Sequence, residues 1–267
     1  MENENTTELL IIELAPDVRM EFIQIPAGKF IMGSDKSKDE DARDDELPQH
    51  NVTLSAYWIG KHSVTNLQYQ AFVQAKGVSA PKHWQDGQIP AGKENHPVVN
   101  VSWLEAEAFC QWASERLRAG APAALAKKVR LPTEAEWEKA ARGMDGRLYP
   151  WGDPAPTITM CNYTEVVKDT TPVGQYSPQS DSPYGCVDMA GNVWDWTADW
   201  YNPTYYQASP KRNPQGPETG QARVLRGGAM NSLDILIRCA ARTRFAPTLL
   251  YNNIGFRCAA SKISSKA

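Results

Sequence analysis

Three stretches of the chain combine a helical spacing of apolar residues with the polar residues that begin a helix. In each, a Ser or Thr is followed three residues later by Glu or Gln, so that the two side chains can cap the first backbone N–H groups. The pairs are Thr65 with Gln68, Ser102 with Glu105, and Thr133 with Glu136. We therefore expect three helices of about ten to fifteen residues. Gly77 and Gly143 are placed to end the first and the third.

Strand patterns are short and lie near the N-terminus. Residues 21–31 alternate apolar and polar side chains around Pro26, which predicts a hairpin, and residues 52–59 are rich in β-branched and aromatic side chains. From Leu148 onward Gly, Pro, Asn and Asp dominate for about a hundred residues, with almost no helical period. The pattern predicts one compact α+β domain with low regular secondary structure.

Two segments have the composition of surface insertions. Residues 35–46 are dense in charge, and Asp39 and Asp41 are spaced as in a calcium-binding loop. The Gly and the final Glu that such a loop needs are missing, so we expect a solvated loop without metal. Residues 119–128 are small and apolar and then basic, which also indicates an insertion at the surface.

Composition and charge exclude several classes of protein. The chain has 42% hydrophobic and 22% charged residues and a net charge of −3, which is typical of a globular protein and gives no basic footprint for nucleic acid. No apolar stretch approaches the roughly eighteen residues of a membrane span. The acidic N-terminus differs from a secretory signal, and the five cysteines form no CxxC pair, so we expect a cytoplasmic protein with reduced thiols.

Ordered sequence blocks across residues 20–260 closely resemble the sulfatase-modifying-factor family, that is, the formylglycine-generating-enzyme domain. The blocks are 25–34, 99–103, 130–137, 184–196, 226–228 and 253–257. The resemblance implies an irregular α+β fold, a variant of the C-type lectin fold. We accordingly expect an N-terminal extension at 1–19, one domain at 20–260 and a C-terminal tail at 261–267.

The resemblance also implies where catalytic chemistry would lie. Catalytic members oxidise a substrate cysteine with copper held by two cysteines between the Gly-Gly pair and the Arg-Cys-Ala-Ala-Arg block. Here that interval, residues 229–237, contains no cysteine. Since a thiolate pair is what cuprous copper prefers, no copper is expected. The four His at 50, 62, 83 and 96 lack metal-site spacing, and nothing resembles the separate helical domain in which related iron sulfoxide synthases carry their histidine ligands.

Two further expectations follow from the resemblance. Asp188, Asn192 and Asp195 offer hard oxygen ligands in a turn, and Asn162 with the carbonyl of Tyr163 matches a second position where family members bind calcium, although Gly174 replaces an aspartate there. A structural calcium ion and simple turn capping are equally compatible with these residues. The framework also implies that Cys110 lies close to Cys258, and that Cys239 faces Ala141.

Residues 229–251 depart from the polar, Asn-rich run of other family members. Scaffold residues such as Asn231, Arg238, Arg242 and Asn253 are kept, while apolar residues appear between them. This interleaving resembles the variable proteins of diversity-generating retroelements, in which adenines, chiefly of AAC codons, are replaced. Such codons never yield Lys, Glu, Gln or Trp, and none of these four occurs from 231 to 253.

The function predicted from this segment is non-catalytic ligand binding, because exposed apolar and aromatic side chains are typical of interaction sites. The expected binding residues are Met230, Ser232, Leu233, Asp234, Leu236, Thr243, Phe245, Ala246, Thr248, Leu249, Leu250 and Tyr251. Ile235 and Ile237 are the better core candidates. The expected partner is a protein or other macromolecule, without nucleic acid or membrane. The alternatives are a divergent oxidoreductase of the formylglycine-generating type acting on a thiol, a relative with different chemistry on this scaffold, and a stabilising or regulatory paralogue without chemistry.

Overall fold

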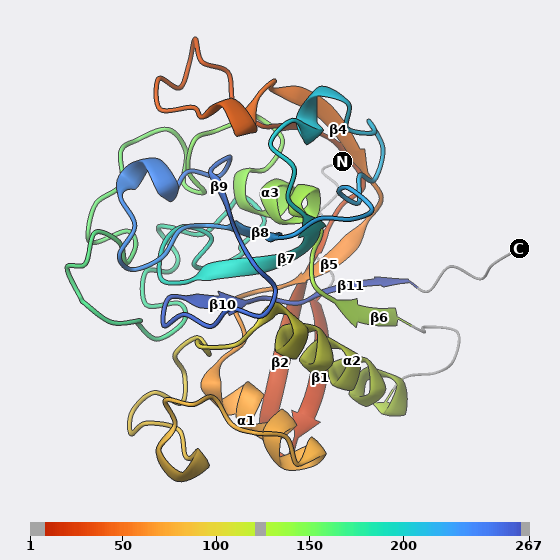
Figure 1. Ribbon diagram of the computed structural model, residues 1–267, viewed down its shortest axis with the longest axis vertical. Helices are drawn as coiled ribbons and strands as arrows, with labels where there is room; N and C mark the ends of the chain where they lie inside the picture. Colours follow the sequence, from red (N-terminus) through yellow and green to blue (C-terminus); the bar gives the residue numbers. More distant parts are fainter. Residues whose placement is uncertain (1–8, 121–126, 263–267) are drawn as a thin grey trace, which may run out of the picture.

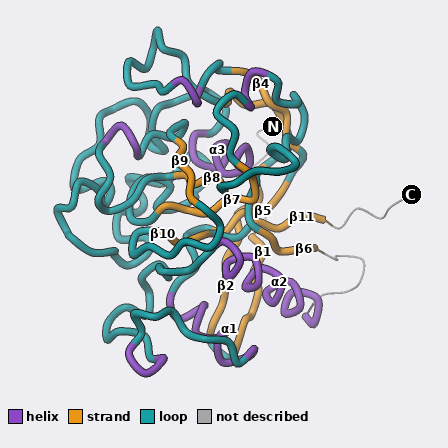
Figure 2. Tube along the Cα trace, in the orientation of Figure 1, coloured by secondary structure: helices purple, strands orange, loops and turns teal. Residues whose placement is uncertain are grey.

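The computed structural model describes residues 9–120 and 127–262, which form a mixed α+β structure rich in loops (Figures 1 and 2). The helices are α1 (Asn66–Lys76), α2 (Trp103–Gly120) and α3 (Glu134–Arg142). The strands are β1 (Leu9–Ala15), β2 (Val18–Ile25), β3 (Gly28–Met32), β4 (His50–Leu54), β5 (Tyr57–Gly60), β6 (Lys127–Arg130), β7 (Trp194–Trp200), β8 (Arg223–Arg226), β9 (Arg242–Phe245), β10 (Ile254–Phe256) and β11 (Ala259–Lys262). None of the described helices has the length and apolar character needed to cross a membrane.

All three predicted helices are confirmed, and their capping groups explain where they begin. The Thr65 hydroxyl accepts a hydrogen bond from the Gln68 N–H, and Thr133 and Glu136 form the same reciprocal box. The Glu105 carboxylate accepts from the Ser102 N–H at 2.7 Å. The first helix ends where Gly77 adopts a left-handed conformation (φ 62°), which costs glycine little.

The strands form three sheets. One has the order β1-β2-β5-β11-β6, a second has the order β10-β7-β8-β9, and β3 pairs with β4 alone. In Figure 1, α1 and α2 lie beside β1 and β2, while α3 lies beside β7 and β8. The largest apolar cluster contains side chains from α1 and α2 and from the strands β1, β2, β7 and β10. Within it, the Phe109 ring of α2 lies 5.4 Å from the Phe256 ring of β10.

The predicted hairpin at residues 21–31 is wrong. β2 pairs with β1 and β5, whereas β3 pairs with β4 in another sheet. The turn between β2 and β3 carries the chain from one sheet to the other, and the Lys139 ammonium of α3 holds it by donating to the Pro26 carbonyl at 2.6 Å. Alternation along the chain identified both strands correctly, but pairing depends on residues far away in the sequence.

The predicted solvated loop at 35–46 is also wrong in part, because Asp39, Asp45 and Glu46 are buried. The Arg238 guanidinium neutralises Asp39 and contacts Glu46 at 2.9 Å. A buried carboxylate needs such a partner, and this one comes from 192 residues further along the chain. The insertion predicted at 119–128 lies partly outside the described residues.

Strands extend beyond both ends of the domain predicted at residues 20–260. The N-terminal extension expected at 1–19 contains β1, whose Ile12 and Leu14 are buried in the core. Of the tail expected at 261–267, Ser261 and Lys262 belong to β11, and the rest lies outside the described residues. The framework cysteines are placed as expected, with the Cys110 and Cys258 sulfurs 3.5 Å apart. Cys239 and Ala141 share a second apolar cluster.

Candidate functional site

The candidate binding segment leaves β8, passes two glycines, crosses the surface and returns through β9 to β10. Gly228 has φ 74°, and a Cβ there would lie 2.4 Å from the Ile237 side chain. No other residue fits this close approach. Ile237 is fully buried and Ile235 is half-buried, which confirms Ile237 as a core residue.

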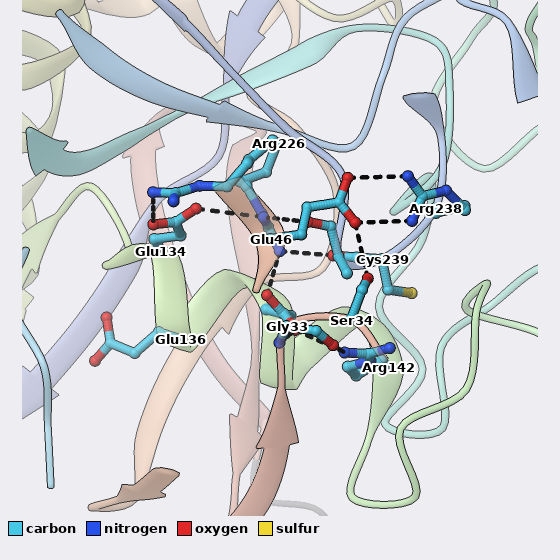
Figure 3. A network of polar contacts seen from close by, with 12 residues as sticks. Gly33, Ser34, Glu46, Glu134, Glu136, Arg142, Arg226, Arg238 and Cys239 are labelled. Atoms are coloured by element: carbon cyan, nitrogen blue, oxygen red, sulfur yellow. Dashed lines mark hydrogen bonds and ion pairs between the residues drawn. The ribbon is translucent and has the colours of Figure 1, made fainter. Parts of the chain in front are cut away.

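Buried arginines of this segment hold it to the body of the protein (Figure 3). We call Arg226, Arg238, Arg242 and their acidic partners Asp39, Glu46, Glu134 and Glu138 the charged frame. Arg226 contacts Glu138 at 2.5 Å and donates to the Cys239 carbonyl at 2.6 Å. Arg242 contacts Glu134 at 2.8 Å.

The charged frame also holds the loop at residues 33–46. Arg238 binds both oxygens of Glu46 at 2.9 Å, and the Ser34 hydroxyl donates to the same carboxylate at 2.7 Å. On the other side, Arg142 bridges Glu138 at 2.7 Å to the Gly33 carbonyl at 2.7 Å. Removing one partner from such a buried pair typically costs about 3–5 kcal/mol, because it leaves an uncompensated charge. The backbone of 226–242 is therefore held from inside.

Between and after these anchors the segment carries exposed apolar side chains. Leu233 is 59% exposed and Tyr251 41%, and Leu249 and Leu250 are exposed beside it. We call these four residues the apolar surface. Of the polar candidates, Asp234 and Thr248 are exposed as well.

Six other predicted binding residues are partly or wholly covered. Leu236, Thr243, Phe245 and Ala246 are half-buried. Leu236 and Phe245 pack on the main core, and the Phe245 ring lies 4.9 Å from that of Tyr251. Met230 and Ser232 are buried, and the Ser232 hydroxyl accepts from the Ala229 N–H at 2.9 Å. The prediction that Met230 and Ser232 lie on an exposed surface is therefore wrong, because the turn after Gly228 directs both side chains inward. The other four residues are only partly exposed.

The first candidate calcium group already has partners for its oxygens. The Asp195 carboxylate accepts from Arg257 at 2.5 Å, from Trp137 at 3.0 Å and from Ser63 at 2.9 Å. Arg257 also donates to the carbonyl of Asp188 at 3.2 Å. The guanidinium supplies the positive charge that a metal would bring.

The other two side chains of this group are similarly engaged. Asn192 Oδ1 accepts from the Thr171 N–H, and Asp188 Oδ2 accepts from the Gly174 N–H. Burial raises the pKa of Asp188 to about 6, which opposes its charged form. These three residues therefore do not fit a calcium ion.

The second candidate calcium position is different. Asn162 is buried, and its amide nitrogen donates to the Asp169 carbonyl at 2.8 Å. Its Oδ1 has no hydrogen-bond partner within residues 9–120 and 127–262. An unpartnered buried acceptor next to the Tyr163 backbone fits a cation ligand. Throughout the described chain, however, no three His, Cys, Asp or Glu side chains are grouped to hold a metal.

The cysteines offer no exposed thiolate. All five are described and buried. Burial raises the pKa of Cys161 and that of Cys239 to about 12, and it raises the pKa of Cys186 to about 11. A thiol that stays protonated is a poor nucleophile and a poor ligand for metal ions.

A cavity of about 360 Å³ lies beside the binding segment and was not predicted from the sequence. Met230 and Asn252 line one side, and Asn66, His83, Lys93 and Asn100 are among the residues that line the rest. Backbone hydrogen bonds such as Asn100 N–H to the Tyr251 carbonyl, 2.9 Å, bring these distant segments together. No local sequence pattern marks these residues, apart from the capping box of Thr65 and Gln68, which lies beside Asn66 at the start of α1.

Comparison with known proteins places the chain in a family. The model of the sulfatase-modifying factor enzyme 1-like domain matches residues 13–262. The formylglycine-generating enzyme of Streptomyces coelicolor is 36% identical over 89% of this chain and 88% of its own length.

Two solved structures share the fold. The Treponema denticola variable protein 1 is 26% identical with a TM-score of 0.75, covering 95% of this chain and 99% of that one. PvdO from Pseudomonas aeruginosa is 26% identical with a TM-score of 0.78, covering 94% and 98%. These matches confirm the irregular α+β fold expected from the sequence blocks, and the chain belongs to the sulfatase-modifying-factor family of formylglycine-generating-enzyme-type domains.

Proposed function

We propose that this protein is a non-catalytic binding protein whose ligand contacts the segment 229–251. The observation that carries this proposal is the separation of roles within one segment. The charged frame holds the backbone from inside, while the apolar surface points outward and contributes little to the core. Exposed apolar groups on a rigid support are typical of interaction sites.

The ligand we propose is a protein or another macromolecule. Aromatic and aliphatic anchors dominate the binding energy at protein interfaces, and Tyr251 with its leucine neighbours supplies both kinds. A paired strand supports them: β9 pairs with β8, and the Phe245 ring of β9 lies 4.9 Å from the Tyr251 ring.

We further propose that the exposed positions are diversified, as in retroelement variable proteins. The likeness to the Treponema variable protein supports this proposal, as does the absence of Lys, Glu, Gln and Trp from 231 to 253. The neighbouring DNA tests it. We expect a reverse transcriptase gene and a near-copy of the 3′ coding segment that differs only at adenines. A locus without either would contradict diversification. The binding function does not depend on diversification and would still be tested by binding experiments.

The alternative, a thiol oxidoreductase, is favoured by the similarity to proteins named formylglycine-generating enzyme. Two observations oppose this alternative. The interval 229–237 contains no cysteine, and all five thiols are buried. Incubation with copper, reductant, oxygen and a Cys-x-Pro-x-Arg peptide should therefore give no aldehyde product by mass spectrometry. Turnover that a copper chelator abolishes would establish the enzyme and refute the non-catalytic assignment.

We also propose one structural calcium site, formed by Asn162 Oδ1 and the Tyr163 carbonyl. The buried, unpartnered acceptor supports this choice over the group around Asp195. Millimolar calcium should raise the melting temperature of the parent, since a ligand that binds only the folded state stabilises it. The Asn162→Leu variant should lose that shift while Asp188→Asn keeps it. Equal shifts in both variants, or no shift in the parent, would count against this site.

A further inference from the structure

The five-stranded sheet ends in two strands of opposite character (Figure 1). Its order, β1-β2-β5-β11-β6, leaves β1 and β6 as the two edges. Three of the four residues of β6 are basic, and charged residues are a common device against pairing at a sheet edge. β1 begins Leu-Leu-Ile-Ile and has no charged residue before Glu13. β1 is therefore the edge at which another strand can pair.

The hydrogen bonds of β2 show which backbone groups of β1 face outward. The Lys61 N–H donates to the Glu21 carbonyl at 2.9 Å, so Glu21 directs its backbone groups toward β5. Because this direction alternates along an antiparallel strand, the next residue, Phe22, directs its own groups toward β1, where it is paired with Leu10. Leu10 therefore bonds to β2, and the residues on either side of it direct their backbone groups to the open edge.

Leu9, Ile11 and Glu13 present these outward backbone groups. Within residues 9–120 and 127–262, no group hydrogen-bonds to them from that side. The side chains of Leu9 and Ile11 are 50% and 49% exposed, and Glu13 is exposed as well. A row of unpaired backbone groups with apolar side chains beside it is a template for one more strand.

A second copy of β1 satisfies this edge. In an antiparallel pair about a two-fold axis at Ile11, the outward groups of Leu9, Ile11 and Glu13 meet those of the same three residues in reverse order, so each donor has an acceptor. Ile11 then faces Ile11 of the other copy, and Leu10 faces Ile12, so apolar side chains meet on both faces of the sheet. A bulge follows Glu13 and ends the regular part of the strand.

Other pairings of the two edges are less favourable. Two β6 strands would bring like charges together. Pairing of β1 with β6 of another copy would leave one edge of each kind open, so that the assembly would continue chain after chain. A contact between two β1 strands uses the same surface on both copies and closes after two chains.

We infer that the protein forms a two-fold dimer in which the β1 strands of two copies pair antiparallel through their edges. The contact joins the two five-stranded sheets into one continuous sheet. It is small, because only residues 9–13 of each strand pair, so the dimer dissociates on dilution. The inference does not depend on the proposed binding function. A dimer carries two copies of the segment 229–251, which strengthens binding to a ligand with repeated sites.

Sedimentation velocity of the whole chain tests the dimer. Between low micromolar concentration and about 0.1 mM, the mass should rise from 29.7 kDa toward twice that value. Ile11→Lys places two like charges opposite each other at the axis and should leave a monomer at every concentration. Ile158→Lys is the matched control, because Ile158 is similarly exposed (56%) but lies outside this sheet, and it should dimerise like the parent. Melting curves check that both variants fold.

Hydrogen exchange resolved by NMR distinguishes edge pairing from a contact through the face of the sheet. In the parent dimer the Glu13 amide should exchange slowly, because it is bonded to the other copy, and in Ile11→Lys it should exchange fast. The amides of Leu10 and Ile12 are bonded to β2 and should be protected in both proteins.

Several outcomes would overturn the inference. A parent that stays monomeric up to about 0.1 mM does not pair through β1. A dimer that Ile11→Lys leaves intact forms through another surface, and assemblies that grow beyond two chains are not closed by a two-fold axis. A dimer that Ile11→Lys dissociates, but whose Glu13 amide exchanges fast, is held by the face of the sheet and not by its edge. Since β1 lies outside the segment 229–251, none of these outcomes decides the proposed binding function.

Discussion

The arginines of the charged frame and the residues of the apolar surface lie within fewer than thirty consecutive residues, yet the arginines are buried and the apolar residues are exposed. Arg226, Arg238 and Arg242 are buried with ionic partners, while Leu233 and Tyr251 face the solvent. Ordinary globular proteins tend to place these residue types the other way round. The inversion shows that this segment is supported by specific polar contacts, while its apolar groups are exposed to solvent.

The difference has an energetic consequence. A buried ion pair depends on the exact geometry of both partners, so few substitutions are tolerated there. An exposed leucine makes few contacts within the protein, so its replacement changes stability little. A scaffold that presents variable residues requires this division, because no variable residue can then be essential for folding.

The largest expected effect comes from breaking the charged frame. Arg238→Met leaves Asp39 and Glu46 buried without their cation, and should lower the free energy of unfolding by about 3–5 kcal/mol. In a protein of this size, each kcal/mol lost lowers the melting temperature by roughly 2–4 °C. Thermal and urea unfolding measure the change.

Arg244→Met is the matched control, because Arg244 lies on the same strand as Arg242 but is exposed. It stacks on the Tyr201 ring at 4.4 Å, a contact of about 0.5–1 kcal/mol at an exposed site. Equal losses in the two variants would show that the charged frame has no special role in stability.

An intermediate effect should depend on pH. Asp199 accepts a hydrogen bond from the Glu134 N–H next to the charged frame. Burial, together with the nearby Glu134, raises the pKa of Asp199 from 3.8 to about 8. Because the folded state then binds more protons than the unfolded state between these two values, the free energy of unfolding contributed by Asp199 falls as the pH rises through that window.

Asp199→Asn keeps an oxygen acceptor for Glu134 and removes the titration. The variant should therefore gain stability relative to the parent as the pH rises from about 4 to 8, as followed by melting temperatures across the range. A difference between variant and parent that stays constant with pH would mean that Asp199 is ionised throughout.

The smallest expected effect on stability comes from the apolar surface. A variant with Asn at Leu233, Leu249, Leu250 and Tyr251 should melt within a few degrees of the parent, because each exposed change typically costs no more than about 0.5 kcal/mol. It should at the same time lose the binding of peptides that were selected on the parent from a random phage-displayed library. A collapse of the melting temperature would assign these residues to the core and remove the proposed binding surface.

Much of the local structure could be predicted from short sequence patterns. The capping pairs placed all three helices, since a cap involves residues only three positions apart. The ordered motif blocks gave the family and with it the proximity of Cys110 to Cys258. The exposure of Leu233 and of 249–251 also agreed with the interleaved pattern.

Tertiary structure decided what depends on distant partners. Asp39 and Glu46 have the composition of a solvated loop, and only Arg238 makes their burial possible. The alternation at 21–31 marks strands correctly, but their partners lie in different sheets. Met230 and Ser232 turn inward because Gly228 approaches Ile237 closely.

The cavity shows the same limit most clearly, because Asn66, His83 and Asn252 have no sequence relation that would bring them together. The sequence by itself determined the helices, the family and the alternation of fixed and changed positions, since these depend on neighbours along the chain. Which charges are buried, which strands pair and where the cavity lies were decided only by the tertiary structure, because a buried polar group is stable only when the fold brings its partner to it.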